Sequence, residues 1–182
     1  MPFASVFFTT LFAATAFASP LKTRQSDSVQ NLPRLLVPLV EDQPDTNFGT
    51  LFTGNISAQG GQHQISMLTS FDIEITRPIC ALSFVASGIE ENYQFTGTQR
   101  FEVWDMPPFN YKEVTWNTHD QPTKYNGIIN INPQGESNSL VFPCRYPYNE
   151  LMVKSVDGDD VYIDWFELAH PILGLLLTQS YE

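Results

Sequence analysis

Two acidic residues have the spacing that acid–base chemistry on a glycosidic bond requires. Asp72 and Glu74 alternate with apolar residues, so on an extended chain their carboxyl groups share one face at about 7 Å. Glycoside hydrolases use two carboxyl groups about 5–9.5 Å apart, one as acid and the other as base or nucleophile. The same alternation is typical of the solvated face of a strand, which is the interpretation we favour. A glycan-active hydrolase is kept as a second alternative.

Other signs of catalysis are missing from the sequence. His63, His119 and His170 are scattered along the chain and form no metal-ligand pair. His119 and Asp120 are neighbours, but adjacent side chains on an extended chain point to opposite sides and do not orient each other. The chain has no G-x-S-x-G elbow and no glycine-rich phosphate loop. We therefore expect a protein that is not an enzyme.

The densest acidic cluster is a candidate calcium site. Asp157, Asp159 and Asp160 surround a glycine, and Ca²⁺ takes six to eight oxygen ligands. The spacing does not match an EF-hand loop, which needs a glutamate at its twelfth position. A solvated hairpin with Asp157-Gly158 at its centre explains the same residues, and we favour it. We expect no cofactor and keep calcium as the alternative.

Aromatic residues near loops are candidates for binding a glycan or a protein. Flat rings stack on the C–H faces of sugars, while Asn, Asp and Gln side chains form hydrogen bonds with the hydroxyls. Rings also fill the cores of sandwiches, so a packing role stays open. The segment 161–168 resembles the penultimate strand of jelly-roll carbohydrate-binding modules, and either Trp165 or Phe166 must face inward. The candidate ligand-binding residues are Trp104, Tyr111, Trp116, Tyr146 and Tyr148.

The N-terminus predicts secretion. Residues 1–18 are an uncharged run rich in Phe, Ala and Thr that ends in Ala16-Phe17-Ala18, the pattern of a signal peptide and its cleavage site. Residues 19–33 are expected to be a propeptide trimmed after Arg24 or an untrimmed flexible leader. Asn55-Ile56-Ser57 is the only glycosylation sequon, so Asn55 is predicted to carry an N-glycan at a strand end or loop. The protein is therefore expected outside the cell, in the medium or in the cell wall.

Two cysteines suit that oxidising compartment. Cys80 and Cys144 are an even number in a secreted chain, which predicts one disulfide; two buried free thiols are the alternative. Metal binding is not expected, because neither cysteine has a second Cys or His at ligand spacing.

The charge of the chain excludes some partners. Nine basic residues face twenty acidic ones, and the formal net charge is −11. Nucleic acids and anionic membrane surfaces bind through clustered Lys and Arg, so neither is expected as a partner. After the N-terminal segment no apolar run is long enough to anchor the chain in a membrane.

The remaining residues read as many short strands. Cys80, Leu82 and Phe84 alternate with residues that point the other way, and turn signals such as Gly60-Gly61 separate the apolar runs. The segment 114–116 is a further candidate strand, and the apolar run 171–177 is predicted to be the last core strand. The sequence therefore predicts one domain over residues 34–182, an all-β, antiparallel, jelly-roll-like β-sandwich.

Four segments resemble one fungal family, the C-terminal domain of ubiquitin 3 binding protein ("But-two"). They are Pro44-Asp45-Thr46-Asn47-Phe48-Gly49, Cys80-Ala81-Leu82-Ser83-Phe84, Phe142-Pro143-Cys144, and Phe166 followed by Pro171-Ile172-Leu173-Gly174-Leu175. The resemblance implies a β-sandwich with one disulfide, in secreted proteins without an assigned activity and without catalytic residues to transfer. Residues 145–148, Arg-Tyr-Pro-Tyr, depart from the small glycine-containing turn usual after the second cysteine, which favours a specific surface there.

Together these observations predict a secreted, non-catalytic fungal protein. Its expected partner is a cell-wall glycan or an extracellular protein, recognised through loop aromatics. The first alternative is a secreted effector that acts on a host partner, and the second is the glycan-active hydrolase.

Overall fold

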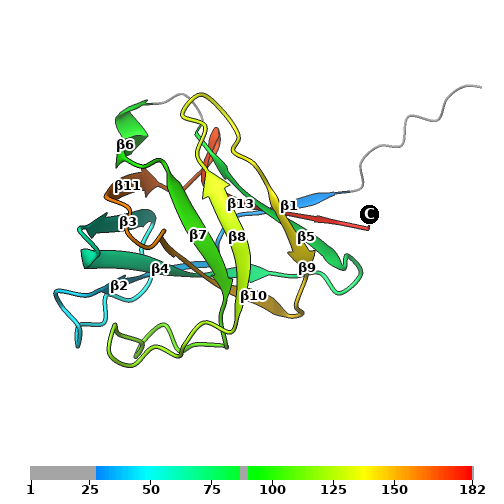
Figure 1. Ribbon diagram of the computed structural model, residues 1–182. Coiled ribbons are helices and arrows are strands. Elements are labelled where there is room, and N and C mark those ends of the chain that lie inside the picture. Colours follow the sequence, from blue (N-terminus) through cyan, green and yellow to red (C-terminus); the bar gives the residue numbers. More distant parts are fainter. Residues whose placement is uncertain (1–27, 87–89, 182) are drawn as a thin grey trace, which may run out of the picture.

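The computed structural model describes residues 28–86 and 90–181. The predicted signal peptide and the trimming site after Arg24 lie outside these residues. In the described part, two antiparallel sheets pack face to face (Figure 1). The predicted all-β sandwich is therefore confirmed. Within the described ranges no helix is long and apolar enough to cross a bilayer.

The two sheets differ in size. Among the described residues, the smaller sheet has the strand order β1-β13-β5-β9, with β12 paired to β13, and the larger has β6-β11-β3-β4-β10-β7-β8, with β2 paired to β4. A 3-10 turn, η1 (Glu90–Asn92), precedes β6. The strands are β1 (Val29–Asn31), β2 (Leu35–Val40), β3 (Thr53–Gln59), β4 (Gln62–Asp72), β5 (Ile79–Val85), β6 (Tyr93–Gly97), β7 (Arg100–Asp105), β8 (Lys124–Asn130), β9 (Leu140–Pro143), β10 (Tyr148–Ser155), β11 (Val161–Phe166), β12 (Leu168–Ala169) and β13 (Ile172–Ser180).

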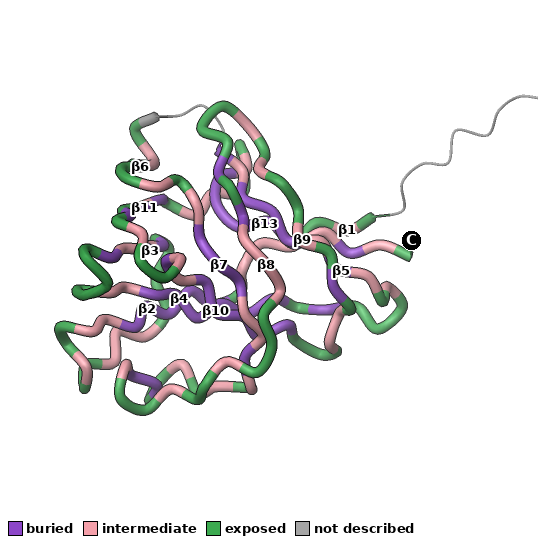
Figure 2. Tube along the Cα trace, in the orientation of Figure 1, coloured by how far each residue is buried: buried purple, intermediate pink, exposed green. Residues whose placement is uncertain are grey.

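The main core lies between the sheets, where Figure 2 shows the buried segments. Leu82 and Phe84 of β5 are fully buried, as their alternation predicts, and Leu175 of β13 joins them, which confirms a last core strand. The Phe84 ring meets the Trp165 ring edge-on, with the centroids 5.3 Å apart. Burial of large rings in both sheets supplies the main driving force for this packing.

The predicted disulfide is present between Cys80 and Cys144, whose Cα atoms are 5.1 Å apart. It joins the start of β5 to the end of β9, two neighbouring strands whose cysteines are 64 residues apart in the chain. Closing a loop of that length stabilises the fold by roughly 4 kcal/mol in the chain-entropy model. The side-chain amide of Asn149 donates a hydrogen bond to Cys80 Sγ at 3.1 Å and so ties the bridge to β10.

Two glycines form the turn between β3 and β4. Gln59 pairs with Gln62, and Gly60 and Gly61 between them have φ values of 58° and 74°. Two consecutive positive φ angles define the primed turn that fits the twist of a hairpin, and glycine adopts them without strain. The turn signal at this position is confirmed.

The predicted hairpin around Asp157-Gly158 is wrong. A turn does form, because the Asp159 amide donates to the Val156 carbonyl at 3.0 Å and Gly158 has a φ of 84°. The strands on either side do not pair, however: β3 and β4 lie between β10 and β11 in the sheet. Residues 157 and 158 determine the local turn, but they do not determine which strand pairs with β10. Both edges of β10 are occupied, one by β4 and the other by β7, so β11 cannot pair with it.

Three further expectations differ from the structure. The alternating segment that contains Asp72 and Glu74 was expected to be a strand throughout, but β4 ends at Asp72 and Ile75 is 73% exposed. Residues 114–116 form part of a folded loop and not a strand, because the Val114 and His119 amides donate to carbonyls four residues earlier. Residues 29–31, expected in the flexible leader, form β1 and pair with β13, so the folded part begins earlier than residue 34.

A second, smaller core lies on the outer side of the larger sheet. Residues 106–123, between β7 and β8, fold over this side, and we call them the strap. Met106 and Val114 of the strap are buried against apolar side chains of β2, β4 and β10: Leu35, Val37, Leu39, Leu68 and Met152. The strap therefore covers one half of the outer surface of the sheet, over β2, β4 and β10.

Candidate ligand-binding face

Three of the aromatic residues predicted to bind a ligand have a packing role. Trp104 of β7 and Tyr111 and Trp116 of the strap are half-buried and pack against the second core. Trp104 also contacts Tyr125 of β8, with the ring centroids 4.9 Å apart. Because all three rings are used in packing, we do not assign them to a ligand.

The other two predicted aromatics are exposed. Tyr146 is 63% exposed and Tyr148 is 41% exposed, on either side of Pro147 at the start of β10. The Arg34 guanidinium lies 4.1 Å from the centroid of the Tyr148 ring, a cation–π contact that occupies one face of it. Of the two rings, Tyr146 is therefore the more accessible to a ligand.

The carboxylates of the candidate calcium site diverge. Arg100 binds Asp159 through two hydrogen bonds of 2.7 and 2.9 Å, which lowers the pKa of that carboxyl. Asp160 accepts a hydrogen bond from the Gly60 amide at 2.6 Å, and Asp157 lies 3.5 Å from the Lys154 ammonium. In the described ranges no three acidic, histidine or cysteine side chains gather as metal ligands, so the calcium alternative is not supported.

The pair of carboxylates suggested for hydrolysis is engaged elsewhere. Asp72 lies 3.5 Å from the Arg34 guanidinium, and Glu74 forms an ion pair with Arg77. A glycosidase pair has two carboxyl groups that face the same glycosidic bond, whereas each of these carboxylates is paired with a different arginine. The structure therefore lends the hydrolase alternative no support at these two residues.

The uncovered half of the larger sheet offers a different surface, formed by β3, β11 and β6. Ile56 of β3 and both Ile163 and Trp165 of β11 are fully buried, so the residues between them point away from the core. We call this surface the open face. Its outward side chains are Thr53, Asn55 and Ser57 of β3, Tyr162, Asp164 and Phe166 of β11, and Gln94 and Thr96 of β6.

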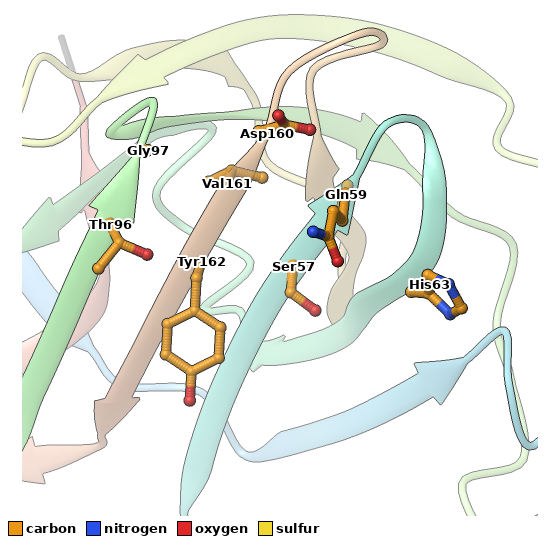
Figure 3. A pocket seen from close by; sticks show the side chains of 9 residues that line it. Ser57, Gln59, His63, Thr96, Gly97, Asp160, Val161 and Tyr162 are labelled. Carbon is orange, nitrogen blue, oxygen red and sulfur yellow. The ribbon is translucent and has the colours of Figure 1, made fainter.

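The strand registers arrange these side chains in rows across the three strands. Tyr162 lies between Ser57 and Thr96. Asp164 lies between Asn55 and Gln94, and Phe166 is paired with Thr53. Figure 3 shows the Tyr162 ring in its place between Ser57 and Thr96. Along β11 the open face thus presents Tyr162, Asp164 and Phe166 in a line, and neutral polar side chains of β3 and β6 lie beside them.

A glycine in β3 determines which ring of β11 is exposed. Trp165 pairs with Gly54, and the indole fills the space where any side chain at position 54 would lie. With Trp165 fully buried, Phe166 is 43% exposed and Tyr162 is 37% exposed. The sequence left the choice between Trp165 and Phe166 open, and Gly54 was the signal that could have decided it.

Two shallow hollows lie on the open face. The one beside Tyr162 has a volume of about 390 Å³ and also contacts Ser57, Thr96 and Asp160. The one beside Phe166 has a volume of about 510 Å³ and also contacts Gln94 and Asp164. Each hollow therefore combines one exposed ring with hydrogen-bonding groups.

The electrostatics of the open face are neutral to acidic. Asn55 Nδ2 donates to Asp164 Oδ1 at 3.2 Å, which orients both side chains. Among the described residues, no lysine or arginine lines either hollow. His63 borders the first hollow, and its hydrogen bond to Asp42, at 2.8 Å, raises the pKa of the imidazole.

The predicted glycosylation site is part of this face. Asn55 lies in the middle of β3, half-buried, and not at a strand end or loop as expected. Its Oδ1 atom is buried without a hydrogen-bond partner. Occupancy of the sequon stays a prediction, and a glycan there would lie across the open face.

Comparison with known proteins places the chain in a family. A family model for the ubiquitin 3 binding protein But2 C-terminal domain matches residues 31–171. The chain belongs to this family. The match covers well over half of the chain and contains the segments 44–49, 80–84 and 142–144 that carry the resemblance. A search among curated proteins finds no match.

The four segments that carry the resemblance have structural roles in this chain. Asn47, in the first segment, donates to the Val114 carbonyl at 2.6 Å and to the Tyr111 carbonyl at 3.1 Å, and so holds the strap. The second and third segments supply the disulfide. In the last, Gly174 has a φ of 110° and lies against Glu167 and Trp165, where no side chain fits. Apart from Phe166, which lies on the open face, these segments build the fold.

Proposed function

We propose that this member of the But2 C-terminal domain family is a secreted, non-catalytic binding protein of the fungal cell surface, and that its ligand lies on the open face. The observation that carries the proposal is the pair of exposed rings, Tyr162 and Phe166, on a flat half of the sheet that the strap leaves uncovered. Exposed aromatic rings beside fixed polar groups are typical of recognition surfaces.

The absence of a catalytic role in this proposal rests on the carboxylates. Asp164 accepts a hydrogen bond from Asn55 and Asp160 accepts one from the Gly60 amide, so both carboxylates are already engaged. The two residues are four positions apart, a distance of about 13 Å along an extended strand, which is longer than glycosidases use. Binding without turnover therefore fits the open face better than hydrolysis.

Secretion is supported by the pattern of residues 1–18, and a secreted protein would meet the cell wall. An effector with a host partner is the competing function. Binding through the open face requires that Asn55 carries no glycan in the fraction that binds, because a glycan there would cover the rings.

Retention on insoluble fungal cell-wall material tests the proposal. We expect the mature protein to be retained, and the Tyr162→Ala/Phe166→Ala double variant to lose affinity by about tenfold or more, as aromatic hot spots do. Both side chains point outward, so the variant keeps its core, which circular dichroism and the melting temperature check. Tyr146→Ala is the matched control, an exposed ring away from the face, and it retains wild-type binding.

Two results would contradict the proposal. Equal retention of the double variant and the wild type would remove the open face as the binding site. A wild-type protein that passes through wall material unretained, but captures a host protein, would favour the effector function. The mass of the retained fraction before and after N-glycosidase treatment shows whether Asn55 is free.

A further inference from the structure

We propose that the open face binds a neutral, linear polysaccharide, with one sugar-stacking position at Tyr162 and another at Phe166. This inference rests on the function proposed above and names the chemistry of its ligand. The geometry of β11, the polar row between the rings and the charge of the surface each contribute to it.

The spacing of the rings fits an extended ligand. Tyr162 and Phe166 are four residues apart on one strand face, so their Cα atoms are separated by about 13 Å. Each ring borders its own hollow, of about 390 and 510 Å³. Two separate positions along a straight strand suit a chain molecule that reaches both, and a single sugar reaches only one.

The row between the rings suits hydroxyl groups. Asn55, Asp164 and Gln94 place an amide, a carboxylate and a second amide side by side across the three strands. A sugar hydroxyl both donates and accepts, and this row offers donors and acceptors without a net positive charge. The 3.2 Å hydrogen bond between Asn55 and Asp164 orients two of these groups before a ligand arrives.

The charge of the surface selects against other ligands. The hollows have Asp160, Asp164 and Glu91 at their rims and no described lysine or arginine, and His63 beside the first hollow is paired with Asp42, so phosphorylated or acidic polysaccharides are repelled. The buried centre of a protein–protein interface is depleted of charged residues, whereas the carboxylate of Asp164 lies at the centre of the open face. A neutral glycan is not repelled by the carboxylates, and its hydroxyl groups can form hydrogen bonds with the polar row.

Soluble oligosaccharides of increasing length test the inference. The probes are laminarihexaose and chitohexaose, compared with glucose and N-acetylglucosamine, by titration calorimetry on the intact mature protein. We expect at least one hexaose to bind about tenfold or more tighter than its monosaccharide, because linked contacts add through effective concentration. Tyr162→Ala and Phe166→Ala each lower hexaose affinity about tenfold and leave monosaccharide affinity within about twofold to threefold.

Two further variants separate stacking from general damage to the surface. Tyr162→Phe keeps the ring and retains hexaose binding, while Asp164→Ala removes the central carboxylate and weakens it. Tyr146→Ala has no effect. A hexaose that binds no tighter than the monosaccharide, or equally to the wild type and the Tyr162→Ala variant, would overturn the inference.

Treated wall material distinguishes this failure from failure of the proposed function. Retention that depends on the open face, survives glucanase and chitinase, and disappears after protease treatment would identify a protein ligand; the binding function would then stand and the glycan inference would fall. Retention that does not depend on Tyr162 and Phe166 would remove both.

Discussion

Glu167 is a buried carboxyl group at the junction of β11 and β13. Its Oε2 atom accepts hydrogen bonds from Trp165 Nε1 at 2.8 Å and from the Leu175 amide at 3.3 Å, while its Oε1 atom is buried without a partner. Burial raises the pKa of Glu167 from 4.5 to about 8, and the two hydrogen bonds oppose the rise only in part. The folded protein therefore holds this proton at neutral pH.

The proton makes stability depend on pH. In the unfolded chain Glu167 titrates near 4.5, and in the folded chain near 8, so folding takes up a proton between these values. The contribution of protonated Glu167 to the free energy of unfolding is complete below pH 4.5. It is lost as the pH rises to about 8, at a slope of roughly 1.4 kcal/mol per pH unit. We expect Glu167→Gln, which stays neutral, to flatten this slope in urea unfolding between pH 5 and pH 7.5.

Two other groups contribute a background in that experiment. Burial raises the pKa of Glu150, and the hydrogen bond to Asp42 raises the pKa of His63, so some fall in stability with pH remains in the Glu167→Gln variant. A variant whose unfolding free energy falls as steeply as that of the wild type would show that Glu167 is ionised in the folded state.

Asn47 connects the strap to the loop between β2 and β3. Asn47 donates hydrogen bonds to two strap carbonyls, those of Tyr111 and Val114, and its own Oδ1 accepts the Gly49 amide at 3.2 Å. Other contacts between the β2–β3 loop and the strap involve Asn117, which bonds Pro44 and Asp45. Asn47 thus connects the first family segment to the second core.

Asn47→Ala leaves the two carbonyls without their donor, and we expect it to lower the free energy of unfolding by roughly 1–3 kcal/mol. Protease cleavage within residues 106–123 becomes faster, because the loop opens locally before the sheet does. Asn110→Ala, an exposed asparagine inside the strap that bonds Glu113, is the control. If both variants are cleaved at the same rate, Asn47 does not hold the strap.

The strands show how far the sequence alone predicts this fold. Alternation located β5, whose inward residues Cys80, Leu82 and Phe84 are fully buried, and the apolar run 171–177 located the last core strand. Alternation did not predict the strap. Val114 and Trp116 are two residues apart, which is the spacing of a strand, although they belong to a loop that packs on the sheet. The order of strands was not predictable either: the turn after β10 looks like a hairpin, and its strands separate because β4 and β7 already pair with β10.

The candidate site was the harder prediction for a similar reason. Trp104, Tyr111 and Trp116 are as aromatic as Tyr162 and Phe166, and only burial against Leu68 and Met152 separates the two groups. That burial arises from residues far apart in the sequence. Composition could name rings as candidates, but three-dimensional packing decides which of them remain free.

At the scale of the whole molecule, the two halves of the larger sheet have different uses. The strap closes one half over the second core, and the disulfide secures the opposite sheet. The other half is built from β3, β11 and β6 (Figure 1). On this half Tyr162 and Phe166 are exposed. A rigid sandwich that leaves one polar, aromatic half-sheet open is the basis of the binding function proposed for this chain.

Nuclear magnetic resonance of the ¹⁵N-labelled protein, titrated with solubilised cell-wall oligosaccharides, tests the open face most directly. The account predicts that the side-chain amides of Asn55 and Gln94 and the backbone amides of β11 shift with ligand, while the indole signals of Trp104 and Trp116 in the second core stay in place. Shifts confined to those indoles or to the Tyr146 turn, or no shifts at the highest soluble concentration, would contradict it.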